Sequence, residues 1–71
     1  MVSLEKYREY NPYTEAIFIG KSGDLIVIDR YGVNDYGAWW TDEEHLYDDT
    51  FGSSVRGTLE GILSELKDEI I

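Results

Sequence analysis

The chain has 71 residues and a formal net charge of −9. It contains no cysteine and one histidine, His45, which excludes disulfides and Cys- or His-based metal sites as sources of stability. With 42% hydrophobic residues it can bury a small core, but no apolar run approaches the ~20 residues that a membrane-spanning helix needs. Its first residues also lack the apolar centre of a signal peptide. We therefore expect one cytoplasmic domain over residues 1–71.

A short helix is the first predicted element. Ser3 can cap its start, and Leu4 and Tyr7 lie one helical turn apart, as residues on one face do. Pro12 disfavours helical backbone at the preceding residue, Asn11, so the helix should stop there.

Two β-strands are predicted next, over residues 14–19 and 24–30, because both segments are rich in Ile, Val and Phe. The turn-forming residues 20–23 connect them as a hairpin. This turn contains part of a phosphate-binding loop motif, but Glu15 stands where that motif needs its first glycine. The continuous apolar run over residues 25–28 indicates that both faces of the sheet are covered.

A third strand over residues 38–41 and a long C-terminal helix complete the predicted fold. The helix is expected because apolar residues in the last third recur at the 3.6-residue helical period, in one stripe: Phe51, Val55, Leu59, Ile62, Leu63, Leu66 and Ile70. The fold class is α+β, a three-stranded antiparallel meander with the helix packed across it. Its core should comprise Ile17 or Phe18, Ile26, Ile28, Val55, Leu59, Ile62, Leu63 and Leu66.

Small residues fall opposite the apolar stripe of this predicted helix: Ser54, Gly57, Gly61 and Ser64. Each glycine weakens a helix by up to about 1 kcal/mol relative to alanine. They are either tolerated surface residues or the site where another helix approaches closely. The second interpretation predicts self-association, with a homodimer as the simplest form.

A catalytic or metal site is not predicted. His45 lies beside Glu43 and Glu44, which could orient its imidazole, but no serine lies in a nucleophile-elbow pattern. The carboxylates over residues 42–49 lack the spacing of a calcium-binding EF-hand loop. We therefore expect a protein that is not an enzyme and that uses no cofactor and no metal.

Acidic and aromatic residues are concentrated between residues 31 and 55, which hold six acids and no base. An aromatic ring beside a carboxylate is suited to arginine, since the ring stacks on the guanidinium and the carboxylate accepts its hydrogen bonds. The candidate partner-binding residues are Tyr36, Trp39, Trp40, Asp42, Glu43, Glu44, Tyr47, Asp48 and Asp49. The alternative is that the aromatics form core and the acids only solvate the surface.

The two adjacent tryptophans should point to opposite sides of the sheet if they lie on a strand. One of Trp39 and Trp40 would then pack under the C-terminal helix. The other would be covered by the N-terminal segment or left exposed for a partner.

The predicted function is that of a non-enzymatic protein-binding module. An acidic balance argues against direct contact with nucleic acid or anionic membranes and favours a basic protein partner. We expect an inhibitor or regulator of a nucleic-acid-binding protein or nuclease, acting by nucleic-acid mimicry. In size and acidity the chain is similar to small inhibitors made by phages and bacteria, although no motif ties it to a named family. The alternative is an assembly component that self-associates through the small-residue helix face and an exposed sheet face.

Overall fold

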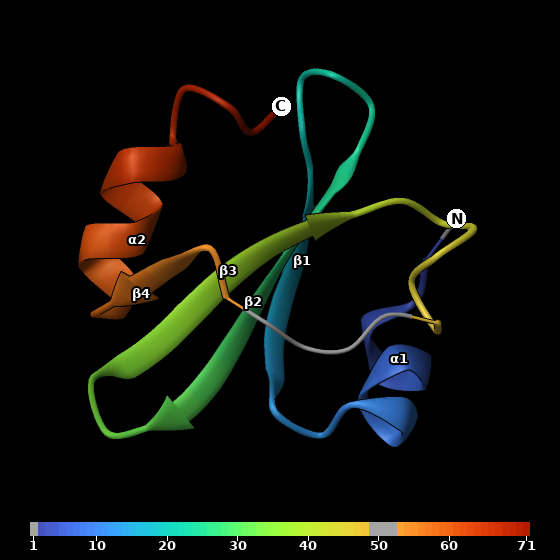
Figure 1. The fold of residues 1–71 in the computed structure, drawn as a ribbon, viewed down its shortest axis with the longest axis horizontal. Helices are drawn as coiled ribbons and strands as arrows, with labels where there is room; N and C mark the ends of the chain where they lie inside the picture. The colour runs from blue at the N-terminus through green and yellow to red at the C-terminus, as the bar shows by residue number, and fades with distance from the viewer. Residues whose placement is uncertain (1, 49–52) are drawn as a thin grey trace.

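The computed structural model describes residues 2–48 and 53–71. In these residues a four-stranded antiparallel sheet carries one helix against each face, and its strand order, β1-β2-β3-β4, is also the chain order (Figure 1). The α+β class and the antiparallel meander are confirmed, but the sheet has one strand more than predicted. The elements are α1 Leu4–Tyr10, β1 Thr14–Ile19, β2 Leu25–Gly32, β3 Asp35–Thr41, β4 Val55–Gly57 and α2 Leu59–Leu66.

The N-terminal helix α1 begins and ends where its local sequence predicts. The Ser3 side chain accepts a hydrogen bond from the backbone N–H of Lys6 at 3.4 Å, which caps the first turn. At the other end the backbone N–H of Asn11, in an extended conformation, donates to the carbonyl of Tyr7 at 2.9 Å. The residue before Pro12 therefore closes the helix and turns the chain toward β1.

A tight turn joins β1 to β2, as the sequence predicts for residues 20–23. The backbone N–H of Gly20 donates to the carbonyl of Asp24 at 2.8 Å, and that of Gly23 donates to the carbonyl of Gly20 at 2.9 Å. Gly23 has φ 89°, a backbone conformation that favours glycine over residues with a side chain. The phosphate-loop-like residues are thus a hairpin turn.

The predicted long C-terminal helix is wrong in its first part. Val55–Gly57 is a strand, β4, whose residues Val55 and Gly57 pair with Ala38 and Tyr36 of β3. The helix begins at Leu59, after the Thr58 side chain accepts a hydrogen bond from the N–H of Gly61 at 3.1 Å. Val55 packs from its strand against the hydrophobic cluster that also contains Ile62 and Leu66 of α2. An apolar residue is therefore needed at this position although it is not helical, and this is why it fitted the helical stripe. Phe51 lies outside the described residues.

This correction also removes the predicted small-residue helix face. Ser54 lies before β4, where its N–H donates to the carbonyl of Ala38 at 2.9 Å, and Gly57 lies within β4. Only Gly61 and Ser64 are on α2, where both are exposed. The four residues therefore do not form one helical surface, and self-association stays a prediction without that geometric basis.

Two hydrophobic clusters cover the two faces of the sheet. The cluster under α2 consists of the buried residues Ile26, Ile28, Ala38, Ile62 and Leu66, with Phe18, Val55 and Leu59 among the partly buried residues around it. The cluster under α1 consists of Tyr7, Leu25, Val27, Trp39 and Leu46. Alternate residues of the run over 25–28 point to opposite clusters, so coverage of both faces is confirmed. Leu63, predicted as core, is only partly buried.

After α2 the chain returns to the free side of β1 (Figure 1). Gly20 forms an isolated antiparallel bridge with Ile70. The N–H of Lys21 donates to the carbonyl of Glu69 at 2.8 Å, and the N–H of Ile71 donates to the carbonyl of Ile19 at 3.0 Å. One end of β1 is therefore paired on both of its edges. Neither helix is long and apolar enough to cross a membrane within the described part of the chain.

Candidate protein-binding surface

A buried carboxylate, Asp29, organises the α1 side of the sheet. Its side chain is fully buried. One oxygen, Oδ1, accepts hydrogen bonds from Asn11 Nδ2 at 3.2 Å and from Thr14 Oγ1 at 2.9 Å. The other oxygen, Oδ2, accepts from the indole Nε1 of Trp39 at 2.9 Å. These bonds supply the partners that a carboxylate needs when it is removed from water.

Trp39 is therefore not part of a partner-binding surface, which corrects its sequence-based assignment. Its side chain is 4% exposed, and its indole N–H is used by Asp29. Trp40 points to the other face and packs, partly buried, against the cluster under α2. The prediction that one tryptophan packs under the C-terminal helix is confirmed for Trp40. Of the two alternatives for the other tryptophan, coverage by the N-terminal segment is the correct one, since Trp39 shares its cluster with Tyr7 of α1.

Near the β2–β3 turn, the acidic and aromatic side chains are engaged by arginines of the chain itself. The Arg56 guanidinium lies 4.4 Å from the centre of the Tyr31 ring and donates to Asp35 Oδ1 at 2.8 Å. This hydrogen bond and the Asp35 charge raise the pKa of Arg56. The Arg30 guanidinium lies 5.9 Å from the Tyr36 ring centre. Tyr36, a predicted partner-binding residue, is accordingly half of an intramolecular cation–π pair.

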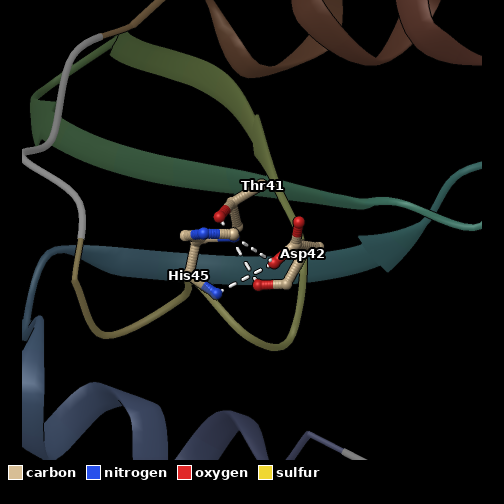
Figure 2. A network of polar contacts seen from close by, with 3 residues as sticks. All are labelled: Thr41, Asp42 and His45. Carbon is tan, nitrogen blue, oxygen red and sulfur yellow. Dashed lines mark hydrogen bonds and ion pairs between the residues drawn. The ribbon is translucent and has the colours of Figure 1, made fainter.

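The opposite end of β3 leads into the acidic loop, which we define as residues 42–48. Asp42 Oδ1 accepts hydrogen bonds from the backbone N–H of His45 at 2.9 Å and lies 2.8 Å from its ring Nδ1 (Figure 2). The His45 side chain, followed by its backbone N–H, lowers the pKa of Asp42. Leu46 is 1% exposed and belongs to the cluster under α1, so its packing holds the acidic loop against the core.

A group of three tyrosines adjoins the acidic loop. The ring centres of Tyr7, Tyr10 and Tyr47 lie 5.2–5.7 Å apart, in tilted and edge-to-face arrangements. Tyr7 is buried, whereas Tyr10 is 42% and Tyr47 is 44% exposed. Tyr47 is among the partner-binding residues predicted from the sequence, and Tyr10 is not. The spacing of Tyr10 three residues after Tyr7, on one face of α1, is the signal that could have identified it.

The Tyr7 hydroxyl has no hydrogen-bond partner among the residues that the structure describes, although it is buried. Burial raises the pKa of Tyr7 to about 12, and the negative charge of Asp29 adds to the shift. The Asn11 side chain opposes part of this shift but does not meet the geometry of a hydrogen bond with the hydroxyl.

The structure brings together most of the predicted acidic residues on one exposed loop. Asp42, Glu43, Glu44 and Asp48 are all exposed, and Asp49 lies outside the described residues. Two exposed tyrosine rings accompany them. We define the acidic–aromatic patch as Tyr10, Asp42, Glu43, Glu44, Tyr47 and Asp48.

Comparisons with known protein families, curated proteins and solved structures return no match. Over residues 2–48 and 53–71, no three His, Asp or Glu side chains are grouped as a metal site would require.

Proposed function

We propose that the chain is a non-enzymatic protein-binding module whose acidic–aromatic patch binds Lys and Arg side chains of a basic protein. The target class would be a nucleic-acid-binding protein or nuclease, which the module would inhibit or regulate by placing carboxylates where phosphates normally bind. One observation carries this proposal. The exposed carboxylates of the acidic loop lie beside two half-exposed tyrosine rings, and the buried side chain of Leu46 fixes this loop to the core.

The chain itself contains an example of the recognition geometry. Arg56 stacks on the Tyr31 ring while its guanidinium contacts the Asp35 carboxylate at 2.8 Å. An arginine from a partner could stack in the same way on Tyr10 or Tyr47 and reach a carboxylate of the acidic loop. Because both tyrosine rings already contact other rings, little side-chain freedom would be lost on binding.

The net charge of the chain should raise the rate of association with a basic partner as well as the affinity. A net charge of −9 on 71 residues attracts a basic surface before contact is made. This attraction is screened by salt, because the Debye length falls from about 10 Å at 0.1 M to about 3 Å at 1 M. Salt dependence alone, however, would not locate the site.

A charge-matched pair of triple variants locates it. The first combines Glu43→Gln, Glu44→Gln and Asp48→Asn in the acidic loop, and leaves Asp42 intact because Asp42 holds His45. The second combines Glu60→Gln, Glu65→Gln and Glu69→Gln, three exposed residues on and after α2. Both variants lose three negative charges, so their long-range attraction for a basic protein falls equally.

The probe is an arginine-rich peptide, with binding measured by calorimetry at ~0.05 and ~0.5 M salt. We expect the loop variant to weaken binding about tenfold more than the helix variant. The melting temperature of the loop variant should be unchanged or higher, since like-charge repulsion is relieved. Equal losses in the two variants would show that only net charge matters, and the patch would then be rejected as the site.

A further inference from the structure

The outer edge of β1 has a backbone that is only partly paired. Gly20 donates to Asp24 across the β1–β2 hairpin, so in an antiparallel ladder the backbone groups of Ile17 and Ile19 point away from β2. The carbonyl of Ile19 is used by the N–H of Ile71. No backbone partner of Ile17 on this outer edge occurs in residues 2–48 or 53–71.

The side chains along this edge do not protect it from further pairing. Natural edge strands are commonly interrupted by lysine, proline or inward-pointing charges. The second half of β1, Ile17–Ile19, carries no charge, and Ile19 is 58% exposed. A bulge at Thr14–Ala16 distorts only the beginning of the strand.

An apolar groove of about 310 Å³ lies on the α1 side of the sheet, next to β1. It is lined by Val2, Leu4, Ile17, Ile19, Leu25 and Glu43. A smaller hollow next to it shares Val2 and Glu43 and is also lined by Lys6 and Tyr47. The groove is therefore continuous with the acidic–aromatic patch.

We propose that the outer edge of β1 and this groove bind an extended segment of the basic partner, in which aliphatic residues alternate with Lys or Arg. The segment would add a strand beside Ile17 and place one aliphatic side chain in the groove. Its neighbouring basic side chain would reach Glu43 and the patch. This inference rests on the proposed function for the charge of the partner, and it adds the conformation in which the partner is recognised.

Two features favour such a segment over a second copy of the chain. The C-terminal residues Glu69–Ile71 already hydrogen-bond to Lys21, just after β1, and to Ile19, its last residue, so this end of the edge accepts backbone pairing. A second copy would bring another charge of −9 against the same surface, whereas a basic segment complements it.

The probe is the capped peptide acetyl-Lys-Val-Lys-Ile-Lys-Val-Lys-amide, compared with the same peptide N-methylated at alternate residues on one edge. Methylation removes the N–H groups that would pair with β1 and keeps the charge. The protein variants are Ile19→Thr in the groove and, as a matched control, Val33→Thr in the β2–β3 turn, which is 82% exposed. Amide hydrogen exchange of Ile17 reports directly on the edge.

We expect N-methylation and Ile19→Thr each to weaken binding by about tenfold, and Val33→Thr to change it by less than about twofold. The Ile17 amide should become protected when the peptide binds. If Ile19→Thr fails to fold, the difference in affinity between the unmethylated and the N-methylated peptide for the unchanged protein still tests whether the segment pairs with β1.

The inference and the proposed function fail in different ways. Salt-dependent binding that is lost in the loop variant but is indifferent to N-methylation and to Ile19→Thr would overturn edge pairing and leave the patch in place. An absence of peptide binding would also overturn edge pairing. If sedimentation gives twice 8.2 kDa and the Ile17 amide is protected without peptide, a second copy occupies the edge, and the proposed segment is rejected.

Discussion

On the α2 side of the sheet the buried cluster is apolar throughout, whereas on the α1 side it adjoins a fully buried carboxylate, Asp29. The first side is held by contacts that depend mainly on buried area and shape. The second side is held in addition by directional hydrogen bonds from Asn11, Thr14 and Trp39.

The difference shows what each kind of interaction contributes. Apolar packing would tolerate small shifts of α2 across the sheet, since hydrophobic contacts are non-directional. The Asp29 hydrogen bonds connect the end of α1, the start of β1 and the middle of β3 to β2, so they define one arrangement of these elements. The acidic loop is attached to the α1 side of the sheet through Leu46. The position of the loop relative to the sheet therefore depends on the packing of that side.

The largest expected effect on stability comes from a substitution on the α1 side of the sheet, where Asp29 is buried. Asp29→Ala would leave the donors of Asn11, Thr14 and Trp39 buried without an acceptor, at a cost of ~1–3 kcal/mol for each unsatisfied group. We expect a total loss near 4 kcal/mol, a large part of the roughly 4–10 kcal/mol available to a domain of this size. Urea unfolding measures it. Asp29→Asn keeps one acceptor oxygen and should cost less; a loss below ~1 kcal/mol for the alanine variant would show that the hydrogen bonds do not hold this side.

A somewhat smaller effect is expected on the apolar side. Leu66 is 2% exposed in the cluster under α2, and Leu66→Ala should lower the free energy of unfolding by about 3 kcal/mol, within the usual range for buried leucine. Leu63→Ala is the matched control, because Leu63 lies on the same helix but is only partly buried. Equal losses from the two substitutions, measured by thermal unfolding, would mean that α2 packs on the sheet through a different face.

The smallest effect concerns a single oxygen atom on the polar side. Tyr7→Phe removes a buried hydroxyl that has no partner in the described structure, and should leave stability unchanged or raise it by about 1 kcal/mol. The pKa of Tyr7 is raised from 10.0 to about 12, so the folded state holds this proton longer than the unfolded state. Stability therefore does not change with pH through this group below pH 10, and it falls between pH 10 and about 12.

Chemical denaturation at pH 9 and pH 11 tests this prediction. The parent protein should lose more stability than Tyr7→Phe between these two values, which span part of the window from 10.0 to about 12. A variant that is clearly less stable than the parent at pH 9 would indicate that the hydroxyl has a partner after all.

Elements that depend on neighbouring residues could be predicted from the sequence. Helix α1 is defined by the cap at Ser3 and by Pro12, and β1 by a short apolar segment that ends at a glycine turn. Each signal lies within a few residues of the structure it determines. The exposed carboxylates of the acidic loop were also identified in this way, because their clustering is visible in the sequence.

Features that depend on distant partners were missed. Strand β4 has three residues, too few to show a two-residue period, and it forms because β3 offers it an edge. The burial of Trp39 depends on Asp29, ten positions earlier, and no sequence pattern links an indole N–H to that carboxylate. Arg56 follows the base-free segment directly, yet its contacts with Tyr31 and Asp35 depend on the pairing of β2 with β3 and of β3 with β4.

The strand order of the sheet has a consequence for how the protein folds. Because each strand pairs with the one that follows it in the chain, no pairing within the sheet needs a crossover connection. Pairing between strands that are adjacent in the chain loses less loop-closure entropy than pairing between distant strands. The bridge between Gly20 and Ile70 joins residues far apart in the sequence, so we expect it to form late and to open first in local fluctuations.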